Sequence, residues 1–240
     1  MFRSFREWGR YMIEDPPLLT IKRRFERPAA EIISAFAGVP VSQVVDAMGG
    51  RGALHYAIKP LSPATATMVG VAVTCHCGPA DNLALFGALD AAASGDVIVA
   101  ATDSFAGTAV TGDLVLGMAR NKGAAGFITD GLVRDVVGIE AVGLPVYCAG
   151  IIANSPARNG PGTVGFPVVV GGVTISPGDI LVGDRDGVAV VPRLEAETVL
   201  ARLAAIRAAE KTLDGLVRQG LEVPDFAKVV LKSNRARFVD

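Results

Sequence analysis

Short runs rich in valine and isoleucine alternate with helical patterns along most of the chain, and this alternation limits the fold more than any other feature. We expect strands around 67–77, 96–100, 125–129 and 145–149, with helices around 28–36, 42–49, 82–94 and 113–122. Alternation of this kind is typical of α/β proteins, in which helices cover a sheet. The sequence therefore predicts an α/β fold.

The pattern changes after residue 160, where the run FPVVVGGVTISPGDILVGDRDGVAVVP contains several short apolar segments. Turn signals separate these segments at 171–172, 176–179 and 184–187. Apolar segments joined by such turns predict a β-meander or a set of hairpins. An amphipathic helix is expected next, over about 194–217, so a strand-rich half and a helix-rich half share one core.

The length and composition of the chain predict a single domain with extensions at both ends. The 240 residues are 50% hydrophobic, which is enough for one substantial core. We expect the domain over 28–217, an N-terminal extension over 1–27 and a C-terminal tail over 218–240. Aromatic residues recur at helical spacing near the start, which predicts an arm that packs against the body or a neighbouring subunit; they are Phe2, Phe5, Trp8 and Tyr11.

The charge and the distribution of apolar residues narrow the range of partners. The net charge is -1 and no long Lys/Arg run exists, so we expect no nucleic acid partner. Apolar runs are all broken well short of the length that spans a bilayer, and Arg3, Arg6 and Arg10 interrupt the start, so neither a membrane protein nor a secreted one is expected. Three cysteines fit a reducing compartment. A cytoplasmic protein with small-molecule partners follows.

The segment TGDLVLGMARNKG carries the start and stop signals of a helix that begins near Asp113. Free main-chain N–H groups from Gly112 through Leu114 to Val115 would point outward there, and such groups favour a bound carboxylate. Gly112 lacks a Cβ and so lets a ligand approach the main chain. The alternative is an ordinary capped helix with no ligand.

Two further segments place polar residues just beyond predicted strands. In AGFITDGLVRD, Arg134 offers a planar fork for a carboxylate and Asp135 a hard oxygen ligand for Mg²⁺ or Mn²⁺, although such a pair is often a surface ion pair. In CGPADNLALFGALD, Asp81 and Asn82 stand where a helix begins, and their alternative role is plain capping. Since each segment follows a strand, the loops are expected to converge on one pocket.

Other patterns in the chain lead to structural interpretations. His76 lies between Cys75 and Cys77, but strand alternation sends the thiols to one face and the imidazole to the other, so buried strand residues are expected in place of a zinc site. Asp184 and Asp186 are interpreted as a hairpin turn and not as a calcium loop. Neither a dinucleotide-binding loop nor a P-loop is present in the sequence.

A series of motifs, in order, resembles a known family. The motifs are VSQVVDAMGG, PADNLAL, SGDVIVA, TGDLVLGMARNKGAAGFITDGLVRD, GLPVYCAG and GGVTISPGDILVGDRDGVAVVP, which cover about residues 28–215. They resemble the class II 4-hydroxy-4-methyl-2-oxoglutarate aldolases and their relatives, which include the regulator of ribonuclease activity A. The resemblance implies a compact β/β/α or α/β/α swivelling-type sandwich that forms homotrimers or hexamers with active sites at subunit interfaces.

The resemblance also implies roles for individual residues. The main chain from Gly112 to Val115 and the side chain of Arg134 correspond to the cradle of a pyruvyl group, and Asp135 to the metal carboxylate. Asp113 corresponds to a group that orients a water at the metal, and Asn82 to a further pocket residue. Glu210 falls near the position of a glutamate that the C-terminal helix of a neighbouring subunit contributes.

These roles together predict a lyase dependent on Mg²⁺ or Mn²⁺ that cleaves a 2-oxo acid to pyruvate, by retro-aldol cleavage or by oxaloacetate decarboxylation. Arg158, in the run ANSPARNG, is expected to contact a distal carboxylate of the substrate. The alternative is a regulator without enzymatic activity that binds a ribonuclease or another protein. In that branch of the family the metal carboxylate is typically lost, and the presence of Asp135 favours the enzyme.

Overall fold

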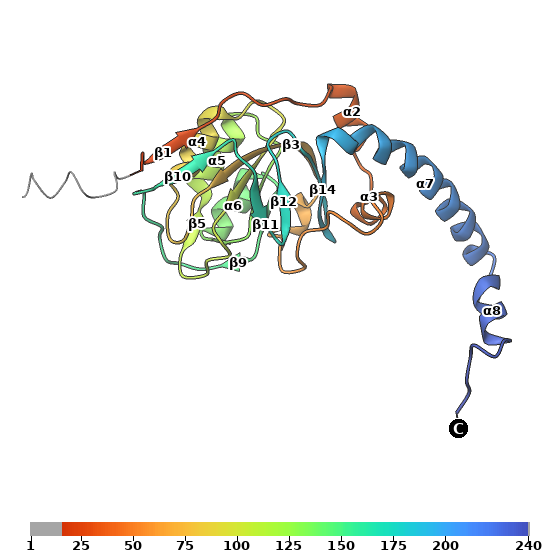
Figure 1. Cartoon of the computed structure of the whole chain (residues 1–240). Helices are drawn as coiled ribbons and strands as arrows, with labels where there is room; N and C mark the ends of the chain where they lie inside the picture. Colours follow the sequence, from red (N-terminus) through yellow and green to blue (C-terminus); the bar gives the residue numbers. More distant parts are fainter. Residues whose placement is uncertain (1–15, 240) are drawn as a thin grey trace, which may run out of the picture.

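The computed structural model describes residues 16–239, which fold into one mixed α/β domain followed by a projecting C-terminal helix (Figure 1). Within the described residues, the main sheet has nine strands. Its centre consists of parallel strands in the order β3, β4, β6 and β8, as the alternating sequence pattern predicts. These strands are Met68–His76, Asp96–Ala101, Gly126–Thr129 and Val146–Cys148.

Shorter strands flank this parallel centre. β13 pairs with the first half of β3 and also with β14, while β10 pairs with the end of β3 and with β1. β2 closes the other edge against β8. These flanking strands are Leu19–Ile21 (β1), Lys59–Pro60 (β2), Gly162–Val164 (β10), Ile180–Asp184 (β13) and Gly187–Val191 (β14).

Three helices cover one face of the parallel centre: α4 (Leu83–Ala91), α5 (Asp113–Asn121) and α6 (Val136–Val142). Alternate residues of the strands face them, so that Val73, Ile98 and Phe127 are fully buried in one apolar cluster with the helices. Burial of apolar surface on this scale is the main favourable contribution to folding. α5 and α6 thereby become fixed beside each other at the edge where the site forms.

The opposite face is covered by the hairpin of β11 (Val168–Val170) and β12 (Val173–Ile175), which turns at Gly171 and Gly172. A third cluster joins β13 and β14 to α3 (Val41–Ala47) and to the first turns of α7 (Ala196–Arg218). The remaining elements are the helices Ala30–Ser34 (α2) and Asp225–Leu231 (α8) and the 3-10 turns Pro63–Thr65 and Arg193–Glu195.

A second, three-stranded parallel sheet lies beyond the carboxyl ends of the central strands. It consists of β5 (Ala109–Thr111), β7 (Leu132–Val133) and β9 (Gly150–Ile151). The chain enters β5 after β4 and enters β7 directly after β6. Gly112 follows the last residue of β5, and Arg134 follows the last residue of β7. The small sheet therefore holds the two predicted site segments side by side.

The ends of the chain differ in part from the sequence expectations. The strand β1 belongs to the main sheet, although residues 19–21 were expected in an extension, because its main chain pairs with β10 over three residues. The aromatic stripe near the start lies outside the described residues. In the part of the chain that the structure describes, none of the helices has the length and apolar character needed to cross a bilayer.

Candidate functional site

Gly112 lies against the side chains of Arg134 and Asp135. A Cβ built at Gly112 would lie 2.5 Å from Oδ2 of Asp135 and 3.3 Å from Cγ of Arg134. The backbone at Gly112 is extended, with φ of -145°, so the absence of a side chain serves the close approach and not a special conformation. The main-chain N–H of Arg134 donates to the carbonyl of Thr111 at 3.1 Å, which holds the two segments in this register.

Asp135 occupies an uncommon backbone conformation at the start of α6. Its φ of 61° and ψ of 46° are in the left-handed region, which costs a residue other than glycine on the order of 1 kcal/mol. Its Oδ2 lies 3.2 Å from Nε of Arg134, and the two side chains are 45% and 36% exposed respectively. The conformation turns the carboxylate back toward Gly112 and Arg134. The guanidinium of Arg134 and the carboxylate of Asp135 thus lie next to each other, and both are partly exposed.

Asp113 lies on the first turn of α5 and packs onto α6. A Cβ built at Gly138 would lie 2.2 Å from Oδ2 of Asp113, so the carboxylate rests directly on the main chain of the neighbouring helix. Oδ1 of Asp113 accepts the N–H of Leu114 at 2.7 Å. One of the predicted carboxylate donors, the N–H of Leu114, is thus already taken by a hydrogen bond within the chain. The first-turn N–H groups of Asp113 and Val115 have no partner within a helix and are the donors suited to an anion.

Asn82 joins α4 to the strand that leads to Gly112. Its side-chain Nδ2 donates to the carbonyl of Val110 at 2.9 Å, while Asp81 takes the capping role by accepting the N–H of Leu83 at 2.8 Å. Asn82 is 2% exposed, and its Oδ1 is a buried acceptor without a partner among residues 16–239. An unsatisfied buried acceptor is costly, so this atom favours a donor from a water or a ligand.

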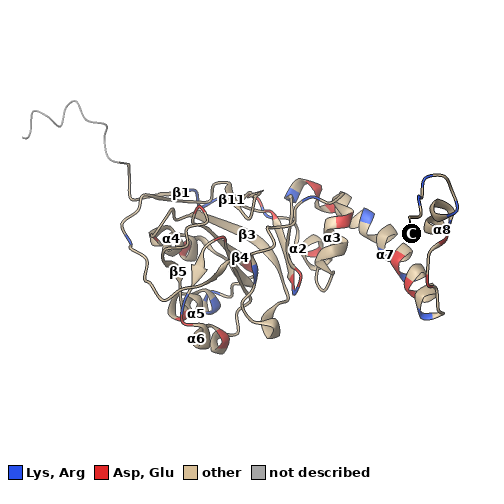
Figure 2. Ribbon diagram, turned by 90° about the horizontal axis from the view of Figure 1, so that it is seen from below, with Lys and Arg blue, Asp and Glu red and all other residues tan. Residues whose placement is uncertain are grey.

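Glu210 is not brought to this site within its own chain. It lies on the exposed part of α7, where its carboxylate accepts a hydrogen bond from the side-chain amide of Gln43. Figures 1 and 2 show α7 projecting away from the part of the body that carries α5 and α6. The predicted role of Glu210 in a neighbouring subunit stays a prediction.

The donor set around Asp135 fits one way of binding a divalent ion. Within residues 16–239, no group of three or more histidine, cysteine, aspartate or glutamate side chains is placed to hold a metal by protein ligands alone. Mg²⁺ in proteins commonly keeps several waters and binds through one or two carboxylates together with substrate oxygens. A single half-exposed carboxylate beside the guanidinium of Arg134 suits that arrangement. Asp135 therefore fits a metal that protein, substrate and water hold jointly.

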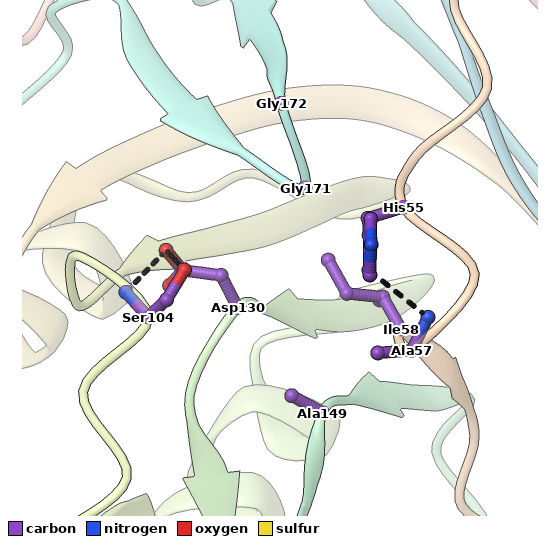
Figure 3. Close-up of a pocket in the computed structure, with 8 residues that line it drawn as sticks. All are labelled: His55, Ala57, Ile58, Ser104, Asp130, Ala149, Gly171 and Gly172. Atoms are coloured by element: carbon purple, nitrogen blue, oxygen red, sulfur yellow. Dashed lines mark hydrogen bonds between the residues drawn. The ribbon is translucent and has the colours of Figure 1, made fainter.

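A separate cavity of about 370 Å³ opens at the carboxyl ends of the central strands. Figure 3 shows His55 across this cavity from Ser104 and Asp130. Asp130 is nearly buried, and it accepts the N–H groups of Thr102 at 2.7 Å and Ser104 at 2.8 Å. Both carboxylate oxygens thus anchor the loop after β4. Asp130 directly follows the strand β6, and nothing in the surrounding sequence indicated this anchoring role.

Cys75 in β3 and Cys77 just after it follow the predicted alternation, but His76 does not follow the expectation of burial. The sulfur atoms of Cys75 and Cys77 are both buried and lie 3.9 Å apart. Cys77 raises the pKa of the Cys75 thiol through a hydrogen bond, and burial adds to the shift. The His76 side chain is 42% exposed and its Nε2 lies 2.9 Å from Oδ1 of Asp103. His76 is the last residue of β3, and its side chain is partly exposed whereas those of Cys75 and Cys77 are buried.

Comparison with known proteins places the chain in a family. The sequence profile described as RraA-like, Aldolase/RraA, matches residues 41–190, which include the segments around Asn82, Gly112 and Arg134. The chain belongs to the Aldolase/RraA family. Its sequence is 39% identical over 172 residues to a candidate 4-hydroxy-4-methyl-2-oxoglutarate aldolase of Halalkalibacterium halodurans, over 72% of this chain and 81% of that protein.

Solved structures and a longer protein extend this relationship. The RraAS2 protein of Streptomyces coelicolor, an unusual member of the RNase ES inhibitor RraA family, has a TM-score of 0.71 and 27% identity, over 80% of this chain and 99% of that chain. An uncharacterized protein of Pseudomonas syringae pv. tomato has a TM-score of 0.72 and 25% identity, over 82% and 96%. Protein DlpA of Legionella pneumophila is 32% identical over 75% of this chain but only 30% of its own length. The family thus includes both aldolases and ribonuclease inhibitors by name.

Proposed function

We propose that this protein is a divalent-metal-dependent carbon-carbon lyase that cleaves a 2-oxo acid to pyruvate. The substrates would be of the 4-hydroxy-4-methyl-2-oxoglutarate type, oxaloacetate, or both. The observation that carries the proposal is the packing of Gly112 against Arg134 and Asp135, with 2.5 Å between a built Cβ and the carboxylate. Because Gly112 has no side chain, Arg134 and Asp135 can lie together against the start of α5, an arrangement that suits a ligand with a carboxylate and an adjacent carbonyl.

The side chain of Arg134 and the first turn of α5 have complementary tasks in this proposal. The guanidinium of Arg134 binds the substrate carboxylate, because its planar donors match two oxygens at once. The N–H groups of Asp113 and Val115 at the helix start would add donors that favour negative charge. As the C3–C4 bond breaks, negative charge grows on the 2-oxo oxygen. Fixed donors at that position each stabilise such charge by about 3 kcal/mol.

Asp135 would hold the metal ion, Mg²⁺ or Mn²⁺. A bound divalent ion supplies a Lewis acid that withdraws electron density from the 2-oxo group. The carboxylate of Asp113 would receive the proton of the 4-hydroxyl through a water. Decarboxylation of oxaloacetate requires no such base. The same residues would therefore support both reactions, and only the aldol cleavage would depend on Asp113.

The assembly and the compartment are part of the proposal. We expect a homotrimer or hexamer in which α7 of one subunit brings Glu210 to the site of the next, since α7 projects from its own body. A cytoplasmic location and a small-molecule substrate, without nucleic acid or membrane partners, accompany this interpretation.

A second candidate function is regulation of a ribonuclease or another protein without catalysis. The name of the Streptomyces coelicolor relative favours it, because that protein belongs to a family of ribonuclease inhibitors. The carboxylate of Asp135 favours the lyase, since a protein-binding surface has no need of a strained acidic residue packed against a glycine.

The deciding experiment is a coupled assay of pyruvate release from a panel of 2-oxo acids, with added Mg²⁺ and with a chelator. The lyase predicts release from oxaloacetate or from 4-hydroxy-4-methyl-2-oxoglutarate that disappears with the chelator and returns with excess Mg²⁺. No release from any substrate, at protein concentrations well above catalytic levels, would reject the lyase and leave the regulator. Release that persists in the chelator would reject the role of the metal.

A further inference from the structure

Ser155 contacts the guanidinium of Arg134 from a loop outside the strands β5 and β7 that lead into the site. Its hydroxyl Oγ accepts a hydrogen bond from Nη1 of Arg134, 21 residues away in the sequence. The residue lies in the loop 152–161, which connects β9 to β10. Neither the match to the family nor the motifs around Gly112 assign a role to it.

The loop is fixed to the body on both sides of Ser155. Before it, the carbonyl of Asn154 accepts the N–H of Ala109 at 2.9 Å, and the side-chain amide of Asn154 donates to the carbonyl of Gly107 at 3.1 Å. After it, Ala157 exchanges main-chain hydrogen bonds with Ala80 at 2.7 Å and Asn82 at 3.0 Å. A hydroxyl held between two anchors has a defined position.

The anchors also link this loop to other parts of the site. Ala109 is the first residue of β5, the strand that ends beside Gly112. Asn82 carries the buried, unpartnered Oδ1. Oδ2 of Asp81 further accepts the N–H groups of Asn159 at 2.5 Å and Gly160 at 3.2 Å. The main-chain segments that position Gly112 and Asn82 therefore also position Ser155.

The contacts of Arg134 leave part of its guanidinium free. Nε lies 3.2 Å from Asp135 Oδ2, and Nη1 donates to Ser155. Among the described residues, no hydrogen bond or ion pair involves Nη2. A guanidinium has five N–H donors in one plane, so two fixed contacts define the plane and leave donors of Nη1 and Nη2 for a carboxylate. Without the second contact, the half-exposed side chain could rotate about its flexible stem.

We propose that Ser155 is a positioning residue that holds the Arg134 guanidinium in the orientation that receives the substrate carboxylate. This inference rests on the proposed function of Arg134. Since a carboxylate is bound in the same way before and during the reaction, Ser155 acts on substrate binding more than on the chemical step. Loss of the hydroxyl raises KM and leaves kcat close to that of the wild type.

The test compares Ser155→Ala, Ser155→Thr and the control Asn159→Ala in the full-length protein. Asn159 is exposed on the same loop, and its side chain makes no described hydrogen bond within residues 16–239. We expect Ser155→Ala to raise KM for the 2-oxo acid about tenfold, with kcat within about twofold, as for a lost hydrogen bond to a charged group. Ser155→Thr has the wild-type KM because it keeps the hydroxyl. Asn159→Ala also has the wild-type KM.

Each outcome decides between the inference and its rejection. Three results would overturn the role of Ser155 while leaving the lyase intact. They are an unchanged KM in Ser155→Ala, an equal rise of KM in Asn159→Ala, and failure of Ser155→Thr to restore the KM of the wild type. If the wild type releases no pyruvate, the proposed function fails. The role of Ser155 is then tested by calorimetric titration of the protein with Mg²⁺ and oxalate. Oxalate binding about tenfold weaker in Ser155→Ala but normal in Ser155→Thr supports the positioning role. Equal binding in all variants, or none in the wild type, rejects it.

Discussion

Substitution of Gly112 by alanine places one methyl group directly against the carboxylate of Asp135, the proposed metal ligand. The new Cβ would lie 2.5 Å from Asp135 Oδ2 and 3.4 Å from Asp135 Cγ. Ordinary contact between such atoms requires about 3.5 Å, so the oxygen must move by about 1 Å. The backbone of Gly112 has φ of -145° and ψ of -170°, which alanine adopts without strain. The perturbation therefore falls on the side chain of Asp135 and, through a contact of 3.3 Å with Cγ, on that of Arg134.

A displacement of this size is expected to affect activity far more than stability. Misplacement of a positioning group by about 1 Å can lower a rate about 100-fold, equivalent to about 2.7 kcal/mol of activation free energy. The Asp135 side chain is 45% exposed and can swing toward solvent, so we expect the free energy of unfolding to change by less than about 1 kcal/mol.

Gly117→Ala is the matched control on the same helix. A Cβ there meets only Val142 Cγ2, at 3.9 Å, and alanine is favoured over glycine within a helix by about 0.5–1 kcal/mol. Pyruvate release and urea denaturation of both variants provide the measurement. Gly117→Ala should keep wild-type activity and be slightly more stable. Equal activity in Gly112→Ala and the wild type would refute the assignment of this contact to the site.

The remaining predictions concern the packing of Asp113 and the buried thiol of Cys148. Gly138→Ala places a Cβ 2.2 Å from Asp113 Oδ2 and 2.6 Å from Asp113 Cβ, so we expect about 1–3 kcal/mol loss in the free energy of unfolding, together with loss of retro-aldol activity. Thermal melting that matches the wild type would contradict the tight contact. Burial raises the pKa of Cys148 from 9.0 to about 11. The buried neutral thiol therefore contributes fully to stability below pH 9, and this contribution is lost as the pH rises toward 11. The wild type should therefore lose more unfolding free energy than Cys148→Ala between pH 9 and pH 11, and parallel losses in urea titrations would argue against the shift.

The long periodic elements of this protein can be predicted from the sequence because their signals are local. The helix expected over 113–122 is found as Asp113–Asn121, and the strand expected over 67–77 as Met68–His76. The helix expected over about 194–217 is found as Ala196–Arg218. In each case an apolar repeat of sufficient length, bounded by turn or capping residues, determines the element. The two turns at 171–172 and 184–187 were predicted for the same reason.

The small sheet of β5, β7 and β9 could not be predicted in this way. Its strands have two or three residues, which is too short for an alternating pattern to appear. Their pairing depends on the main sheet, which delivers the chain to this edge. α6 was missed because it begins at an aspartate in the left-handed conformation, and no helix signal predicts such a start.

The sequence predicted only some of the residues that meet at the candidate site. Placement after strands indicated Gly112, Arg134 and Asp135, and the structure brings these three together. The contact of Ser155 with Arg134 spans 21 residues and a loop without periodicity. Nothing in the sequence determines which hydroxyl reaches the guanidinium, because the two anchors of the loop depend on tertiary hydrogen bonds.

The most direct test of the account compares Asp135→Asn with Glu140→Gln. Asparagine tolerates the left-handed backbone of position 135, so the substitution removes the charge and keeps the fold. Glu140 is an exposed acid on the same helix and controls for the loss of one charge. The measurement is Mn²⁺ binding by electron paramagnetic resonance, with pyruvate release recorded on the same samples. We predict that Asp135→Asn loses Mn²⁺ binding and at least about 100-fold in rate, whereas Glu140→Gln keeps both. Full Mn²⁺ binding and activity in Asp135→Asn would contradict the central claim.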